Sequence, residues 1–420
     1  MTTTDVDAGN TFTYSLVTGA GDADNGSFNI NSTKLRATDS FNFETKSSYT
    51  IRVRSTDQGG LFTEKTVAIT VTNVNETPTD IGLSASSIAE NAGANAVVGA
   101  LSTTDPDASN TFTYSLVTGA GDADNGSFNI SGNSLRATDS FNFETKSSYT
   151  VRIRSTDQGG LFTEKTFTIS VTNVNEAPTD IALSSTSIAE NAGANAVVGA
   201  LSTTDVDAGN TFTYTLVPGT GDTDNGAFNI DDNNLRATGS FDFETKSSYT
   251  VRVRSTDQGG LFTEKTFTIT VTNVNETPTD IGLSSSSIAE NAGANAVVGA
   301  LSTTDPDASN TFTYSLVTGA GDADNGSFNI NGSNLRATSS FDFETKSSYT
   351  VRVRSPDQGG LFTEKTFAIT VTNVNETPTD IGLSSSSIAE NAGANAVVGA
   401  LSTTDPDASN TFTYSLVTGA

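Results

Sequence analysis

The sequence predicts an all-β fold, a tandem array of seven-stranded Greek-key β-sandwich domains that together form an extended rod. The first observation is an internal repeat, because residues 71–78 return at 171–178, 271–278 and 371–378, a period of 100 residues. The second is the alternation of apolar and polar residues in stretches such as 167–171, which places every second side chain on one face of a strand. The third is the frequent use of Thr, Val, Phe, Ile and Tyr, which favour strands, without any helical period.

The period also predicts the domain organisation. A repeat of 100 residues is long enough for each copy to bury its own core, so near-identical copies indicate an array of similar domains. We expect complete domains at residues 79–178, 179–278 and 279–378. Residues 1–78 then form a partial domain without its first strands, and residues 379–420 form a partial domain with the first strands only. Because both ends fall inside the strand pattern, we expect the chain to be part of a longer array.

Seven strands are expected in each repeat, separated by turn signals. In the repeat at 79–178 a polar turn is expected at 88–93, and Asp-Asn-Gly at 124–126 indicates a tight turn. Each repeat ends in a long strand that continues into a polar linker, and the linker ends at proline, which has no N–H for a strand ladder. The expected strands lie at 80–84, 96–101, 112–116, 128–130, 135–137, 149–154 and 162–174.

Composition excludes several classes of ligand. The net charge is −27, which argues against nucleic acid as a partner, because phosphate binding needs Lys and Arg. The chain has no Cys and no His, so it lacks disulfides and the usual ligands of zinc and copper. Any bound metal should therefore be a hard cation that prefers oxygen ligands. The alternative is that the acidic charge only keeps the protein soluble.

The termini and the hydropathy pattern bear on localisation. Residues 1–6 lack the basic and apolar regions of a signal peptide, and no apolar run reaches the length of a membrane span. We therefore expect no membrane insertion within these residues. The expected location is extracellular or on a cell surface, with the secretion signal and anchor outside this stretch.

The acidic residues recur at fixed places in the loops. Because successive strands of a sandwich reverse direction, each loop of the repeat at 79–178 can be assigned to one of the two ends of the domain. In consecutive repeats the carboxylates at the C-terminal end of one face those at the N-terminal end of the next. Such an arrangement repels itself unless a cation is bound, and its oxygen-rich donors suit the six to eight ligands of Ca²⁺. The C-terminal end carries Glu90, Glu144 and Glu176, and the N-terminal end carries Asp105, Asp107 and Asp157.

These motifs resemble the calcium-binding signature of cadherin repeats. The motifs are Ala-Glu-Asn at 89–91, Asp-x-Asp at 105–107, Phe-Glu at 143–144, Asp-x-Gly-Gly at 157–160 and Asn-x-Asn-Glu-x-Pro at 173–178. The resemblance covers essentially the whole chain, and the near-identity of the copies is similar to the tandem arrays of large bacterial surface adhesins. It implies an Ig-like, cadherin-type sandwich with several Ca²⁺ ions bound at each junction between repeats.

The resemblance also implies a ligand set for each junction, named here by its flanking residues. At 78/79 it comprises Glu44, Asn75, Glu76, Asp105, Asp107, Asn110 and Asp157. At 178/179 it comprises Glu90, Glu144, the carbonyl of Val174, Asn175, Glu176, Asp205, Asp207, Asn210 and Asp257. At 278/279 it comprises Glu190, Asp242, Glu244, Asn275, Glu276, Asp305, Asp307, Asn310 and Asp357. At 378/379 it comprises Glu290, Asp342, Glu344, Asn375, Glu376, Asp405 and Asp407.

The chain departs from the family pattern at two places. The first linker Asp of the family is Asn73, Asn173, Asn273 or Asn373 here, and an Asp of the mid-domain motif is Asn in two copies, at 42 and 142. An amide in place of a carboxylate lowers the charge of a site and should weaken calcium binding. The two outer junctions also lack part of their ligand set within this chain, so we expect full occupancy only at 178/179 and 278/279.

Function follows as an expectation. The acidic residues recur in every repeat and lie at domain ends, which is unlike an active site, so we expect no enzyme. The predicted function is calcium binding that stiffens a secreted or cell-surface adhesin, whose partners are calcium and either other copies of the chain or a surface polysaccharide. The alternatives are a passive stalk that presents a ligand-binding domain outside these residues, and a polysaccharide-binding module.

Overall fold

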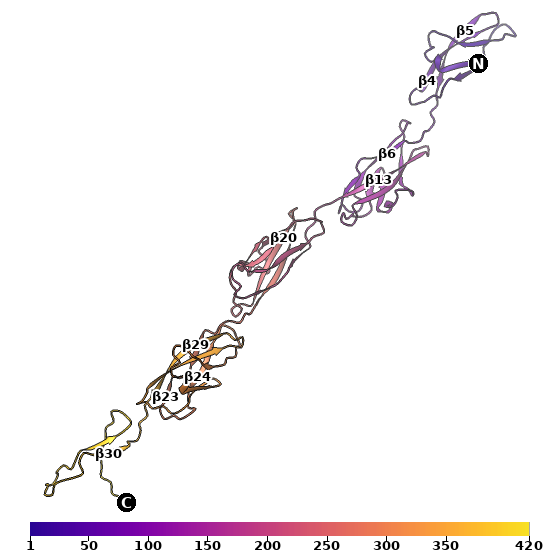
Figure 1. Cartoon of the computed structure of the whole chain (residues 1–420). Coiled ribbons are helices and arrows are strands. Elements are labelled where there is room, and N and C mark those ends of the chain that lie inside the picture. Colours follow the sequence, from indigo (N-terminus) through magenta and orange to yellow (C-terminus); the bar gives the residue numbers. More distant parts are fainter. Residues whose placement is uncertain (420) are drawn as a thin grey trace. The chain divides into compact units, whose positions relative to one another are not determined.

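The structure is a computed structural model that describes residues 1–419 (Figure 1). The backbone divides into two compact units. The first contains Met1–Pro178 and two later loops, Asp205–Thr211 and Gln258–Leu261; the second contains Thr179–Thr204, Phe212–Asp257 and the residues from Phe262 onward. The regular elements of residues 1–419 are β-strands and four short 3-10 helices, η1 (Asn25–Ser27), η2 (Asn125–Ser127), η3 (Asn225–Ala227) and η4 (Asn325–Ser327).

The first unit contains a partial and a complete repeat. The strands of the partial repeat are β1 (Thr13–Leu16), β2 (Phe28–Asn31), β3 (Lys34–Ala37), β4 (Ser48–Thr56) and β5 (Phe62–Thr70). They form one sheet in the order β1-β4-β5 and a second sheet, β2-β3. The strands of the complete repeat are β6 (Asp80–Leu83), β7 (Ser87–Ala89), β8 (Val97–Thr104), β9 (Thr113–Leu116), β10 (Phe128–Ser131), β11 (Ser134–Ala137), β12 (Ser148–Thr156) and β13 (Phe162–Thr172). They form two four-stranded sheets, β10-β11-β8-β6 and β7-β13-β12-β9.

The second unit repeats the complete arrangement twice and adds a final strand pair. Its first repeat contains β14 (Asp180–Leu183), β15 (Ser187–Ala189), β16 (Val197–Thr204), β17 (Thr213–Leu216), β18 (Phe228–Asp231), β19 (Asn234–Ala237), β20 (Ser248–Thr256) and β21 (Phe262–Thr272). Its second repeat contains β22 (Asp280–Leu283), β23 (Ser287–Ala289), β24 (Val297–Thr304), β25 (Ser315–Leu316), β26 (Phe328–Asn331), β27 (Asn334–Ala337), β28 (Ser348–Pro356) and β29 (Phe362–Thr372).

The strand orders in this unit are the same as in the first. They are β14-β16-β19-β18 with β15-β21-β20-β17, then β22-β24-β27-β26 with β23-β29-β28-β25. Beyond them, β30 (Asp380–Leu383) pairs antiparallel with β31 (Leu401–Thr404). Each complete repeat is therefore an all-β sandwich, and the sandwiches follow one another along the chain as the period predicts.

Each complete repeat contains the seven expected strands and one more. The additional strand is β7, which lies where the sequence predicts the start of a polar turn, and Ile88 within it is buried. β6 pairs antiparallel with β8 in one sheet, whereas β7 pairs parallel with β13 in the other. The first segment of the repeat, residues 80–89, thus contributes one strand to each of the two sheets. Sequence reasoning missed β7 because three residues are too few to show a period of two.

The core of each repeat lies between its two sheets. In the repeat of β14 to β21, Ile181 and Leu235 come from one sheet, Val251 and Ile269 come from the other, and all four side chains are fully buried. In β21, Phe267, Ile269 and Val271 are buried on one face, which confirms the alternation seen in the sequence. Burying apolar surface stabilises each sandwich by about 25 cal/mol per Å² removed from water.

The outward arginines of the long hairpin are bonded to a glutamate of the neighbouring strand. In the hairpin of β20 and β21, Glu264 accepts from Arg252 at 2.5 Å and from Arg254 at 2.6 Å, one oxygen to each. The guanidinium of Arg254 also lies 4.0 Å from the ring centroid of Phe262. The same carboxylate fork occurs at Glu64, Glu164 and Glu364. It fixes this face of the longest hairpin without involving the acidic loops.

We also searched the described residues for a helix that could cross a membrane. None of the helices of residues 1–419 has the length and apolar character needed to pass through a bilayer.

Candidate cation site

The candidate site at the 278/279 junction contains a buried glutamate, Glu190. β15 runs parallel to β21, which places Glu190, the residue after β15, beside the end of β21. The backbone N–H of Glu190 donates to the carbonyl of Thr272 at 3.0 Å. Its carboxylate accepts from the N–H of Val274 at 2.6 Å and from the N–H of Phe243 at 2.8 Å, and only 2% of the residue is exposed. These three hydrogen bonds hold the Glu190 side chain and backbone against the end of β21 and the loop at 243.

Aromatic packing brings a second glutamate, Glu244, to the same place. The loop 241–244 is held by Phe241, which is buried and lies 4.4 Å from Tyr249 and 5.3 Å from Phe228 between ring centroids. Glu244 ends this loop, beside the Phe243 whose N–H is bonded to Glu190. Two carboxylates at the C-terminal end of the repeat are therefore directed toward the start of the linker.

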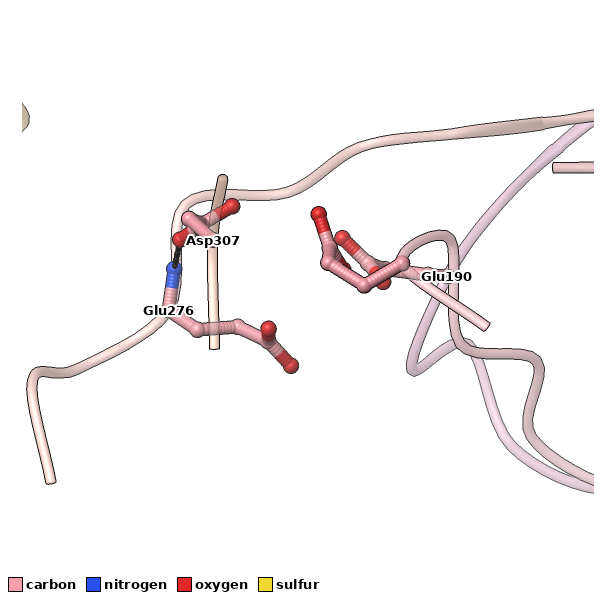
Figure 2. A group of neighbouring side chains, drawn as sticks. Glu190, Glu276 and Asp307 are labelled. Atoms are coloured by element: carbon pink, nitrogen blue, oxygen red, sulfur yellow. Dashed lines mark hydrogen bonds between the residues drawn. The ribbon is translucent and has the colours of Figure 1, made fainter. Parts of the chain in front are cut away.

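The next repeat contributes from the other side of the linker. Asp307 is buried, and its Oδ2 accepts from the backbone N–H of Glu276 at 2.6 Å. The N–H of Asp307 donates in turn to Oδ1 of Asp305 at 2.9 Å. Figure 2 shows Glu276 and Asp307 on one side and Glu190 on the other, with their carboxylates directed toward a common space.

These residues form a compact carboxylate cluster. One oxygen from each member lies within 4.8 Å of the others, and the same kind of cluster occurs at every junction. The four clusters are Glu44, Glu76 and Asp107; Glu90, Glu144 and Glu176; Glu190, Glu244, Glu276 and Asp307; and Glu290, Glu344, Glu376 and Asp407. Among the ion pairs of residues 1–419, none neutralises a member of these clusters.

Burial and neighbouring negative charges both raise the pKa of carboxyl groups in the clusters. Loss of hydration is the main reason that the pKa of the Glu244 carboxyl lies above its ordinary value, and the charges of Glu190, Asp307 and Glu276 raise it further. The pKa of Glu176 is raised in the same way, by desolvation first and then by Glu90, Asp207 and Glu144, against the lowering effect of the Asn91 amide. Each cluster would therefore be stabilised by positive charge.

Several buried oxygens have no hydrogen-bond partner within residues 1–419. They include Oε2 of Glu76 and Glu176, Oδ1 of Asp107, and Oδ2 of Asp105, Asp205, Asp305 and Asp405. A buried carboxylate oxygen without a partner is costly, because it has lost water and gained nothing in exchange. The donors here are carboxylate and amide oxygens with neither sulfur nor imidazole, which fits Ca²⁺.

Two linker asparagines connect the cluster to its surroundings. Nδ2 of Asn273 donates to Oε1 of Glu244 at 2.8 Å and to Oδ1 of Asp307 at 2.9 Å. Nδ2 of Asn275 donates to Oδ2 of Asp357 at 2.9 Å, and a Cβ built on Gly359 would lie 2.6 Å from the Asn275 side chain. The Gly-Gly turn therefore leaves the space that Asn275 occupies.

The structure brings fourteen of the expected ligands into the four clusters and places others elsewhere. Asp242 and Asp342 lie outside the clusters, where each accepts from the N–H and the hydroxyl of a threonine, Thr245 or Thr345. Asn110 accepts from the side chain of Gln158 at 2.8 Å, and Asn310 accepts from Gln358. Asp157, Asp257 and Asp357 are buried in their turns, outside the clusters. The ligand roles of these residues remain predictions.

Sequence reasoning missed one set of supporting residues. Asn91, Asn191 and Asn291 donate to Oε1 of Glu176, Glu276 and Glu376 at 2.6, 2.7 and 2.7 Å. All three have a positive φ, near 57°, which Asn tolerates better than most residues. The signal was the Asn that follows each Glu in the Ala-Glu-Asn motif.

The comparisons with known proteins agree with this architecture. A family model described as "Cadherin domain" matches residues 184–272. The chain is 28% identical over 372 residues to Protocadherin Fat 4 of Homo sapiens, which covers 83% of this chain. The match spans 7% of that relative, so the chain corresponds to a small part of it.

Solved structures show the same fold. The extracellular domain of Protocadherin GammaB4 superposes with a TM-score of 0.62 at 19% identity, covering 94% of this chain and 68% of that one. The cis-dimer structure of Protocadherin gammaB7 EC3-6 gives a TM-score of 0.59 at 21% identity, covering 88% of this chain and 93% of that one. The chain therefore shares the fold of these tandem cadherin ectodomains, and its residues 184–272 match the cadherin-domain model.

Proposed function

We propose that this chain binds Ca²⁺ at the junctions between repeats, and that bound ions limit the motion of one repeat against the next. The observation that carries the proposal is the set of buried carboxylate oxygens without a partner, within or beside clusters that no Lys or Arg neutralises. At 278/279 the ions would be held by Glu190, Glu244, Glu276, Asp305 and Asp307. Bound Ca²⁺ supplies the positive charge that these side chains lack.

The proposal includes the boundaries of the repeats. The units that present these sites are residues 79–178, 179–278 and 279–378, with partial repeats at 1–78 and 379–420. In the first unit of the structure, residues 205–211 pack with the preceding 178 residues, which is consistent with a linker that contacts the loop following it. The N–H of Glu176 donates to Oδ2 of Asp207 at 2.8 Å within this unit.

Calcium binding would serve adhesion at a cell surface or outside the cell. This part of the proposal rests on the adhesion-type module and on the near-identity of the copies, which is similar to that of bacterial surface adhesins. The partner would be a second copy of the chain or a surface polysaccharide. A passive stalk is the second candidate, because the strongly acidic surface also suits a spacer that binds only Ca²⁺.

Hydrogen exchange of the full chain, followed by mass spectrometry over a calcium titration, tests the binding. Residues 67–76, 167–176, 267–276 and 367–376 differ in sequence, so each linker reports separately. We expect Ca²⁺ to protect the linkers at 178/179 and 278/279, while Mg²⁺ at equal concentration protects them much less. Equal exchange with calcium and with chelator would refute the site.

Bead aggregation then separates the two roles. Beads that carry the chain should aggregate only when Ca²⁺ is present if the chain adheres to its own copies. Protected linkers without aggregation, and without binding to an array of glycans, would favour the passive stalk.

A further inference from the structure

The sequence contains five Asn-Gly pairs, away from the acidic clusters. Asparagine followed by glycine loses its side-chain amide readily, because glycine has no side chain to shield its backbone nitrogen from the asparagine amide carbon. Four of the pairs recur at the same place in each repeat, at 25–26, 125–126, 225–226 and 325–326. The fifth pair, Asn331-Gly332, occurs in one repeat only, so it can be compared with four others in the same chain.

The fold holds the side chains of the four recurring asparagines at both ends. Nδ2 of Asn325 donates to the carbonyl of Val317 at 2.9 Å, and its Oδ1 accepts from the backbone N–H of Arg352 at 3.0 Å. Each recurring asparagine is half-buried and begins one of the short 3-10 helices. Attack on the amide carbon would therefore require both bonds to break. The equivalent two bonds are made by Asn25, Asn125 and Asn225.

Asn331 lies in a different environment, at the turn of a hairpin. It ends β26 and is followed by Gly332, which has a φ of 61°. Asn331 is exposed, and among the described residues its side chain has no hydrogen-bond partner. A Cβ built on Gly332 would meet nothing within 4 Å, so the turn is open to solvent. The described residues thus provide no bond that holds this amide away from the nitrogen of Gly332.

The two pairs of this repeat also share their local sequence. Residues 325–327 and 331–333 are both Asn-Gly-Ser, so their intrinsic chemical reactivity should be alike. Any difference in the rate at which the two asparagines react in the native chain should then come from the fold.

We propose that Asn331 is a site of spontaneous deamidation, and that the fold protects the other four Asn-Gly pairs from the same reaction. The nitrogen of Gly332 bonds to Cγ of Asn331, the Cγ–Nδ2 bond breaks, and Nδ2 leaves as ammonia with the proton of the Gly332 N–H. Water then opens the cyclic imide. Cleavage at Cγ gives aspartate at position 331, and cleavage at the backbone carbonyl gives isoaspartate. Water is the co-reactant, and nothing is oxidised or reduced.

The equivalent hairpin of the repeat at 179–278 indicates what the aspartate product would contact. Asp231 lies there at the position of Asn331, and its Oδ2 accepts from Nη1 of Arg236 at 2.8 Å. Arg336 occupies the place of Arg236, and its Nε is buried without a partner within residues 1–419. Deamidation therefore adds a negative charge beside an arginine that can pair with it. Isoaspartate instead adds a carbon to the backbone at a two-residue turn, which should loosen the pairing of β26 with β27.

The test is incubation of the full chain in ¹⁸O-labelled water at mildly alkaline pH. A calcium chelator is present, so the result does not depend on the proposed function. Opening of the imide incorporates an oxygen from water, and fragmentation in the mass spectrometer assigns the label to a residue. We expect Asn331 to be labelled first and Asn325 about tenfold or more slowly, because two hydrogen bonds must break at Asn325. In denaturant the two asparagines should react at similar rates.

Two variants remove and transfer the reactive pair. Asn331→Ser should abolish the label at 331 and leave the rate at Asn325 unchanged. Ser131→Asn places an asparagine before Gly132, whose φ of 62° matches that of Gly332, and should create a second fast site. Hydrogen exchange in β12 and β28, unchanged in both variants, checks that the repeats remain folded. Equal rates at Asn325 and Asn331 in the folded chain, or an excess at Asn331 that persists in denaturant, would overturn the inference.

Discussion

The backbone N–H of Glu276 donates a 2.6 Å hydrogen bond to Oδ2 of Asp307, which connects the linker of one repeat to the first acidic loop of the next. The equivalent bonds of Glu76, Glu176 and Glu376 measure 2.7, 2.8 and 2.5 Å. This backbone hydrogen bond therefore brings the carboxylates of Glu276 and Asp307 together without the help of an ion. The fold itself therefore assembles the negative charge that the proposed cation would neutralise.

The first prediction separates these two roles of Asp307. Asp307→Asn keeps an oxygen that accepts the Glu276 N–H but removes a charge, so calcium affinity at 278/279 should fall about 10- to 100-fold. Exchange of the metal-free linker should change little. Asp307→Ala should increase that exchange as well, because the bond itself is lost.

The control for both variants is Asp139→Asn. Asp139 is exposed and its Oδ1 accepts only from the N–H of Ser140 next to it. This change should leave the calcium response of residues 267–276 as it is in the native chain. A similar loss in the Asp139 and Asp307 variants would show that general charge, and not this contact, controls the affinity.

The second prediction concerns pH. The pKa of Glu244 is raised above its ordinary value of 4.5, chiefly by desolvation, so the folded chain holds this proton more tightly than the unfolded chain does. The stabilisation from protonation is complete below the unfolded pKa and is lost as the pH rises through the raised, folded pKa. The metal-free junction should therefore become less stable toward neutral pH. Calcium must displace the proton, so its apparent affinity should fall as the pH is lowered through that pKa.

The measurement is the calcium midpoint of residues 267–276 as a function of pH. Glu244→Gln cannot ionise, so it should bind calcium more weakly and with less dependence on pH. A native midpoint that does not move on acidification would contradict the argument. Glu264→Gln serves as the control, because the Glu264 carboxylate has its pKa lowered by Arg252 and Arg254, away from the junction.

The third prediction tests the space that glycine leaves for the linker. Gly359→Ala would place a Cβ 2.6 Å from the side chain of Asn275, so Asn275 must move and its bond to Asp357 should be lost. We expect faster linker exchange and weaker calcium binding at 278/279. Gly326→Ala is the matched control, because a Cβ there meets nothing within 4 Å and needs no positive φ. Equal behaviour of the two alanine variants would exclude a steric role for Gly359.

Much of the fold could be predicted because the signals were long and repeated. The alternation in residues 167–171 identified the strand whose Ile169 and Val171 are buried. β7 could not be predicted, because its role depends on a parallel pairing with β13 that is distant in sequence. The bonds of Arg152 and Arg154 to Glu164 were not predicted either, because they depend on the register of the hairpin, which pairs Arg154 with Glu164.

The candidate site was predictable in its residue types but not in its connections. The motifs named Glu190, Glu276 and Asp307, which the structure brings within a few ångströms of one another. They did not indicate that Asp242 would instead bond Thr245, because a side chain two residues from a ligand can turn either way. The amides of Asn191 and Asn273 were missed as well, since a neutral donor leaves no charge signal in the sequence.

The last prediction concerns the acidic loop that leads into each repeat. Ser309 has a φ of 65°, in the left-handed region that costs a residue with a Cβ about 1 kcal/mol, whereas the equivalent Gly209 has a φ of 80° without that cost. A Cβ at Gly209 would meet nothing within 4 Å, so the backbone angle alone decides. Ser309→Gly should therefore stabilise its loop by up to about 1 kcal/mol, and Gly209→Ser should destabilise its loop by a similar amount. Native-state hydrogen exchange of residues 305–311 and 205–211 measures both local free energies, and changes of the same sign in the two variants would show that left-handed strain does not control these loops.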